Sequence, residues 1–122
     1  MESPYKSGTG VLRVLNALRC AFAGLAAAAR HEEAFRLELL ACALLLPLAF
    51  RLDATAVERA LLVASLLVVL IVELVNSAIE TAVDRVSLEL HPLAKRAKDI
   101  GAAAVMLSLV SAGVVWLIVL TA

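Results

Sequence analysis

Charged, aromatic and cysteine residues are all scarce in this chain of 122 residues. Charged side chains make up 18% of the sequence and aromatic ones 4%, and there are only two cysteines. Cys20 and Cys42 have neither CxxC nor histidine spacing, which argues against a zinc site and favours packing roles. Eleven acidic and eleven basic residues give a net charge of zero, which argues against nucleic acid as a partner.

Two kinds of nucleotide-binding signature are also missing. The five glycines form no G-x-x-x-x-G-K-[ST] motif, which excludes a P-loop. The sequence has no H-R-D or D-F-G element of the protein kinases either. Any phosphoryl transfer by this chain must therefore rest on positioned acids, a metal ion and lysine, because that reaction depends mostly on positioning and electrostatics.

What the sequence has in abundance is apolar residues. They make up 63% of the chain, against about 45–50% in an ordinary soluble domain. One uncharged run, 101–122, is long enough to cross a bilayer core, which needs about 20 residues. The sequence predicts an all-α integral membrane protein, a helical bundle forming one domain over 1–122. Its transmembrane helices are expected at about 34–52, 56–85 and 100–121, with Asp53 or Thr55 capping the second.

A further helix is predicted before these spans, at about 9–30. Its apolar residues fall within one arc at helical spacing, and arginines such as Arg13 and Arg19 fall opposite. This pattern favours a surface helix lying in the membrane interface. Trp116, near the end of the third span, is expected to be an interfacial anchor.

The distribution of lysine and arginine predicts the orientation in the membrane. Five of these residues precede the first span, two lie between the first and second, and four follow the second. The positive-inside rule places the N-terminus and the loop after the second span in the cytoplasm.

An unusual polar stripe runs along the second span. At 3.6 residues per turn one face holds five polar residues: Glu73, Asn76, Ser77, Glu80 and Asp84. A single polar residue can join two helices, and Asp84 alone can pair with Arg85 or Lys95. Stacked carboxylates repel one another, however, unless a cation lies between them or one is protonated. Oxygen ligands such as those of Glu32 and Glu80 favour Mg²⁺.

A buried glutamate beside a metal-binding carboxylate and a lysine suits the transfer of phosphate to a hydroxyl. The stripe reads E-x-x-N-[ST]-A-I-E-x-x-x-D over 73–84 and is followed by Lys98-Asp99-Ile100-Gly101. With Arg13, Gly24 and Glu38 at compatible spacing, it resembles the small bacterial membrane diacylglycerol kinases. The resemblance implies a multi-pass protein of the bacterial inner membrane, a homotrimer with shared active sites that uses ATP and Mg²⁺ to phosphorylate a membrane lipid.

The resemblance also implies roles for individual residues. Glu73 would be the general base and Glu32 and Glu80 the metal ligands, supported by Asn76 and Asp84. Nucleotide-binding residues would be Arg13, Cys20, Glu32, Glu80, Glu89, His91, Lys98 and Asp99. Residues bordering the lipid would be Arg13, Ala17, Phe22, Ala34, Phe35, Glu38, Arg51, Arg59, Glu73 and Ala102. Cys20 and Phe22 depart from the family, which often has an aromatic residue and a tryptophan there.

Other functions remain as alternatives. The segments 86–88 and 91–95 partly resemble the related undecaprenol kinases, whereas Arg85 and 100–103 favour diacylglycerol kinase. Diacylglycerol has ester carbonyls that need donors, for which Arg36, Asn76 and Arg59 are candidates. A small ion-coupled transporter subunit would need acids near the middle of the membrane, and here they gather at one interface. A non-catalytic accessory protein would leave Glu32, Glu80 and Lys98 unexplained.

Overall fold

A computed structural model describes residues 9–86 and 91–122 of the chain. These residues form four helices and no strand: α1 (Gly10–His31), α2 (Glu33–Arg51), α3 (Ala56–Val86) and α4 (Pro92–Thr121). The all-α prediction is confirmed. Each end of α1, α2 and α3 lies within one residue of its predicted position. Only α4 differs clearly, because its helix begins eight residues before the predicted position 100.

The early start of α4 has a local cause. His91 has extended backbone angles and its side chain accepts a hydrogen bond from the Leu93 backbone N–H, while Pro92 occupies the first turn. Proline suits this position because the first helical N–H groups have no partner within the helix. The helix therefore begins directly after His91 and carries its charged residues in its first turns.

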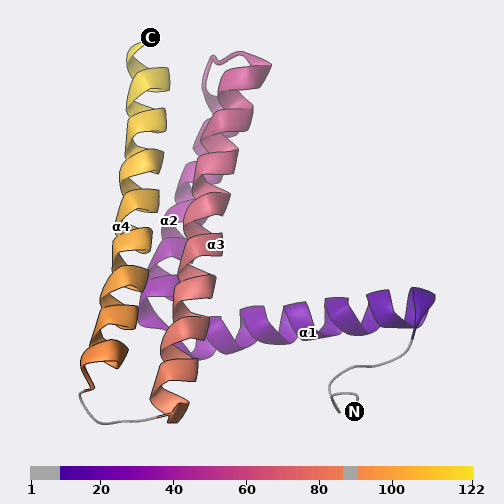
Figure 1. Ribbon diagram of the computed structural model, residues 1–122. Helices are drawn as coiled ribbons and strands as arrows, with labels where there is room; N and C mark the ends of the chain where they lie inside the picture. The colour runs from indigo at the N-terminus through magenta and orange to yellow at the C-terminus, as the bar shows by residue number, and fades with distance from the viewer. Residues whose placement is uncertain (1–8, 87–90) are drawn as a thin grey trace.

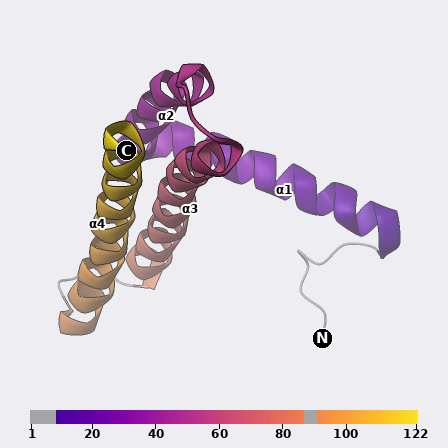
Figure 2. The ribbon, with the colours of Figure 1, turned by 90° about the horizontal axis from the view of Figure 1, so that it is seen from above.

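The helices divide into a bundle and one outlying arm. In Figure 1, α3 and α4 run side by side with α2 packed against α3, while α1 leaves the bundle near the end where α3 ends and α4 begins. Figure 2 shows α1 extending outward from the other three helices. The chain turns at Glu32, which has extended backbone angles. Arg36 fixes the corner by donating to the carbonyl oxygens of Ala29 and Arg30, at 3.1 and 3.0 Å.

The core lies in the part of the bundle away from α1. It consists of Cys42, Ala49, Leu62, Leu66 and Trp116. Trp116 is 8% exposed, and its indole Nε1–H donates to Ser65 Oγ at 3.2 Å. The prediction that Trp116 is an interfacial anchor is therefore wrong, because Ser65 supplies the partner that a buried indole needs. Cys42 packs in the core as predicted, whereas Cys20 is exposed on α1.

Two sets of hydrogen bonds hold the turn between α2 and α3. Thr55 is the predicted cap: its hydroxyl accepts from the Glu58 N–H and Glu58 accepts from the Thr55 N–H, which is a capping box. Arg59 donates to the carbonyl oxygens of Ala49, Leu52 and Ala54, which the end of α2 leaves without helical partners.

The outer surface of the chain is apolar. By length and composition, α1, α3 and α4 could each cross a membrane, while α2 carries four charged residues. The chain is therefore a multi-pass membrane protein. Although α1 is long and apolar enough to cross a membrane, only 6% of its most apolar stretch of 18 residues is buried within the chain. The helix lies across the bundle (Figure 1). Its exposed apolar residues need another cover, and a membrane interface supplies one.

Candidate active site

The polar stripe of α3 lies in the half of the helix that faces α1 and the start of α4. Glu73, Asn76 and Ser77 are buried, Glu80 is half-buried and Asp84 is exposed. With a rise of about 1.5 Å per residue, Glu73 lies roughly 10 Å further along the helix axis than Glu80, toward the apolar core. The stripe therefore runs from the end of the bundle into its interior.

A groove between α1 and α3 leads to this stripe. Its volume is about 1050 Å³. It is lined by Ala21, Gly24, Leu25, Ala27, Ala28, His31, Glu32, Leu74, Ser77, Ala78, Thr81, Ala82 and Arg85. Most of this lining is apolar, and its polar members include Glu32, Ser77, Thr81 and Arg85. The groove thus joins an apolar surface to the acidic stripe.

Four carboxylates lie close enough to act on one another electrostatically, and one of them, Glu32, lines the groove. Glu73 experiences electrostatic repulsion from Glu80 and Glu32, and Glu38 experiences repulsion from Glu73. The ion pairs found over residues 9–86 and 91–122 involve none of these four. Such a cluster is stable only when a cation binds or when carboxylates share protons. The arrangement therefore suits both metal binding and proton transfer.

Lys98 connects α4 to the stripe. Its Nζ lies 2.6 Å from Asp84 Oδ1, so the pair bridges the end of α3 and the start of α4. The alternative partners predicted for Asp84, Arg85 and Lys95, are wrong. Lys95 bonds Asp99 on its own helix instead, at 2.6 Å. Lys98 is thus held beside the acidic stripe, where it can exchange a carboxylate oxygen for a phosphate oxygen.

Asn76, in the polar stripe of α3, lies against Gly101 of α4. Its Nδ2 donates to Glu80 Oε1 at 3.3 Å, which orients that carboxylate. A Cβ atom at Gly101 would overlap Asn76 Oδ1, so α4 approaches α3 this closely only because residue 101 is glycine. Sequence analysis missed the role of Gly101. The available signal was a lone glycine at the start of an alanine-rich apolar run.

The donor set fits a magnesium ion only in combination with a substrate. Among the described residues, no group of three or more His, Cys, Asp or Glu side chains is arranged to hold a metal. Mg²⁺ commonly uses one or two protein carboxylates and takes its remaining oxygens from phosphates and water. Glu32 and Glu80 would supply two such carboxylates, and the hydrogen bond from Asn76 orients the carboxylate of Glu80.

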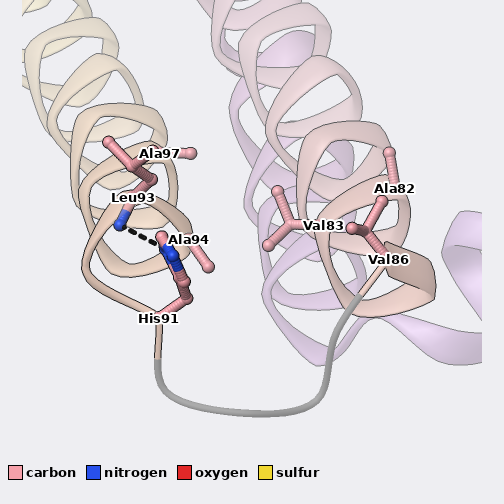
Figure 3. A pocket seen from close by; sticks show the side chains of 7 residues that line it. All are labelled: Ala82, Val83, Val86, His91, Leu93, Ala94 and Ala97. Carbon is pink, nitrogen blue, oxygen red and sulfur yellow. Dashed lines mark hydrogen bonds between the residues drawn. The ribbon is translucent and has the colours of Figure 1, made fainter.

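A second groove lies between the last turns of α3 and the first turns of α4 (Figure 3). It has a volume of about 470 Å³ and is lined by Ala82, Val83, Val86, His91, Leu93, Ala94 and Ala97. Only His91 is polar, and its Nδ1 accepts from the Leu93 N–H at 3.1 Å. This leaves Nε2 as the ring nitrogen able to contact a ligand.

The remaining predicted site residues are spread over the chain. Exposed positions on α1, α2 and α4 include Arg13, Ala17, Cys20, Phe22, Ala34, Arg51, Asp99 and Ala102, and Phe35 is buried. Arg59 is fourteen residues from Glu73 along α3, roughly 21 Å at the usual rise, so the structure does not bring Arg51 and Arg59 to the acidic stripe. Glu89 lies outside the described residues.

Comparison with known proteins gives a consistent result. A family model described as prokaryotic diacylglycerol kinase matches residues 19–120. A protein of Pseudomonas aeruginosa named diacylglycerol kinase is 52% identical over 118 residues, which cover 97% of this chain and 96% of that relative. Relatives with the same name from Escherichia coli strain K12 and Haemophilus influenzae are 45% and 43% identical. The matches cover 92% of this chain in both cases, and 92% and 94% of the respective relatives. The resemblance found in the residue pattern is confirmed.

Proposed function

Because this chain belongs to the prokaryotic diacylglycerol kinase family, we propose that it transfers the γ-phosphoryl group of ATP to the hydroxyl of sn-1,2-diacylglycerol. The product is phosphatidic acid. The observation that carries the proposal is the cluster of Glu32, Glu38, Glu73 and Glu80, of which Glu32 lines an apolar groove. An apolar groove admits a lipid, and the acids supply a base and metal ligands where the lipid hydroxyl would arrive.

Glu73 acts as the general base in this proposal. It lies deepest in the stripe, where a lipid hydroxyl from the bilayer arrives first, and desolvation makes a carboxylate a stronger base. Glu32 and Glu80 hold Mg²⁺, which balances the charge of the phosphates. Asn76 orients Glu80, and Lys98 moves from Asp84 to the phosphates.

The other predicted contacts divide between nucleotide and lipid. Arg13, Cys20, His91 and Asp99 lie on the nucleotide side, and Glu38 borders the lipid next to Glu73. Further lipid contacts are Ala17, Phe22, Ala34, Phe35 and Ala102. Arg51 and Arg59, which the resemblance also assigns to the lipid, lie toward the far end of the bundle, and Arg59 is engaged with backbone carbonyls there. The resemblance and the positive-inside rule support a homotrimer in the bacterial inner membrane, with the N-terminus and the site in the cytoplasm.

A kinase assay in detergent micelles tests the proposed function. The purified protein is given labelled ATP, Mg²⁺ and diacylglycerol, and phosphatidic acid is measured. Glu73→Gln should lower kcat by about 10²–10⁴-fold, the usual contribution of a general base, with KM for ATP nearly unchanged. Glu33→Gln is the matched control, because it removes an exposed acid next to Glu32 and should keep activity.

Two results of this assay would contradict the proposal. Activity of Glu73→Gln within a fewfold of the parent would exclude Glu73 as the base. A higher kcat/KM for undecaprenol than for diacylglycerol in the same micelles would move the protein to the undecaprenol branch and leave the lipid-kinase chemistry in place.

A further inference from the structure

Ser77 is the exception among the buried hydroxyl groups within the described helices. Four other hydroxyls donate to a carbonyl oxygen three or four residues earlier in their own helix: Ser65, Thr81, Ser108 and Thr121. This local bond is the usual way to satisfy a hydroxyl in an apolar helix. Ser77 is only 7% exposed, yet its Oγ has no partner among the described residues. A buried hydroxyl without a partner is costly, which indicates that a ligand supplies one.

The position of Ser77 indicates what that ligand is. Ser77 and Glu32 are both among the residues that line the groove between α1 and α3. Along the helix Ser77 lies about 6 Å from the level of Glu73 and about 4.5 Å from the level of Glu80, between the proposed base and a proposed metal ligand. In the transfer reaction the migrating phosphoryl group occupies the space between the acceptor hydroxyl and the metal-bound phosphates. Ser77 therefore lies at the level of that group.

Three donors around the acidic stripe are already engaged, while the cation Arg85 also lines the groove. Arg36 donates to the end of α1, Asn76 donates to Glu80, and Lys98 is paired with Asp84. Among the buried side-chain atoms without a partner in the described ranges, the other two are oxygens of Glu38 and Asn76, so Ser77 is the neutral donor of the set. Its hydroxyl can approach an anion in this acidic site without first breaking an ion pair.

We propose that the Ser77 hydroxyl is a catalytic contact that donates a hydrogen bond to a non-bridging oxygen of the phosphoryl group during transfer. The inference rests on the proposed function. In that step the lipid hydroxyl oxygen forms a bond to the γ-phosphorus, and the bond from that phosphorus to the β–γ bridging oxygen breaks. The electron pair leaves with ADP, and the hydroxyl proton passes to Glu73. Ser77 keeps its own proton throughout and stabilises the charge on the equatorial oxygens.

Three variants test this contact in the micelle assay with diacylglycerol. Ser77→Ala removes the hydroxyl and should lower kcat about tenfold to hundredfold, the range for a hydrogen bond to a charged group, with little change in either KM. Ser77→Cys keeps the volume but is a weak donor, so it should be about as slow. Thr81→Ala is the control, because the Thr81 hydroxyl lines the same groove but already donates to the Ser77 carbonyl. Its loss of kcat should be smaller than that of Ser77→Ala.

The assay separates this inference from the alternatives. Parent-like kcat in Ser77→Ala or Ser77→Cys, or an equal loss in Thr81→Ala, would overturn it. So would a lower melting temperature at unchanged kcat, which indicates a helix-packing role. With undecaprenol as acceptor the loss in Ser77→Ala should be the same, because the phosphoryl group is common to both lipids. A loss confined to diacylglycerol would assign the hydroxyl to an ester oxygen and overturn the phosphoryl contact. A parent enzyme active only on undecaprenol would contradict the proposed substrate. The kcat of Ser77→Ala relative to the parent, measured with undecaprenol, would then still test whether Ser77 contacts the phosphoryl group.

Discussion

At the scale of single residues, the site depends on a glycine as much as on its acids. Asn76 orients Glu80 by a 3.3 Å hydrogen bond, and it has room to do so because Gly101 carries no side chain. Gly101 is buried in α4 where that helix approaches α3 closely. The orientation of Glu80, the proposed metal ligand on one helix, is thus controlled by the size of a residue on another.

Gly101→Ala should therefore impair both stability and catalysis. The new methyl group would overlap Asn76 Oδ1, so either Asn76 rotates away from Glu80 or the helices separate, at a cost of about 1–3 kcal/mol. We expect at least a tenfold loss of kcat/KM and a lower melting temperature in micelles. Gly113→Ala is the matched control, since a Cβ there meets nothing within 4 Å. It should be neutral or stabilising by up to about 1 kcal/mol, because alanine favours the helix. Equal effects of the two substitutions would contradict this account of Gly101.

At the scale of helices, two arginines tie consecutive elements together. Arg36 donates to the last carbonyls of α1, where α1 turns into α2, and Arg59 donates to three carbonyls at the turn between α2 and α3. Positive side chains suit these places because helix ends carry unpaired carbonyls and a partial negative charge. The first corner also positions Glu32, which stands between α1 and α2.

Arg59→Met tests whether Arg59 holds the turn or binds lipid. It removes three hydrogen bonds from a charged donor and should lower the free energy of unfolding by about 2 kcal/mol or more, with KM for diacylglycerol unchanged. Arg51→Met is the control at the same end of the bundle, where the side chain is exposed, and should change stability by no more than about 0.5 kcal/mol. Denaturant titration in micelles gives the stabilities. A raised lipid KM at normal stability would instead favour the lipid contact predicted from the sequence.

At the scale of the whole molecule, polar chemistry lies at one end of an apolar body. α1 leaves the bundle near the end where α3 ends and α4 begins (Figure 1), and the ion pair of Lys98 with Asp84 and the turn at Glu32 belong to that end. α1 and α4 expose apolar side chains along much of their length. The chain buries little of this apolar surface by itself. The bilayer and neighbouring copies of the chain are the two available covers, and the expected homotrimer would use both.

Mixing inactive chains tests the shared sites of the expected homotrimer. Glu32→Gln and Lys98→Ala should each abolish activity, because one removes a metal-binding carboxylate and the other a phosphate-binding cation. If Glu32 and Lys98 of different chains serve one site, assemblies refolded from both variants should regain a fraction of the parent activity. Each variant refolded alone is the control. Mixed assemblies that stay inactive, together with a monomeric mass in micelles, would exclude the shared site.

The sequence by itself determined the local features of this protein. Apolar content and 3.6-residue periodicity predicted four helices, and the same periodicity placed Glu73, Asn76, Ser77 and Glu80 on one face of α3. These features depend on neighbours within a few residues, so they can be inferred from a single stretch of chain. The start of α4 was local too, but the capping signal of His91-Pro92 was interpreted only as the end of the preceding segment.

Only the tertiary structure decided which faces of different helices meet. The pairing of Lys98 with Asp84, the bond from Trp116 to Ser65 and the close approach of Gly101 to Asn76 each join residues that are distant in the sequence. Periodicity indicates that a face is buried but not what covers it, because many partners of similar size and polarity satisfy the same pattern. For the same reason the unpartnered hydroxyl of Ser77 became visible only once every neighbouring donor and acceptor had been placed.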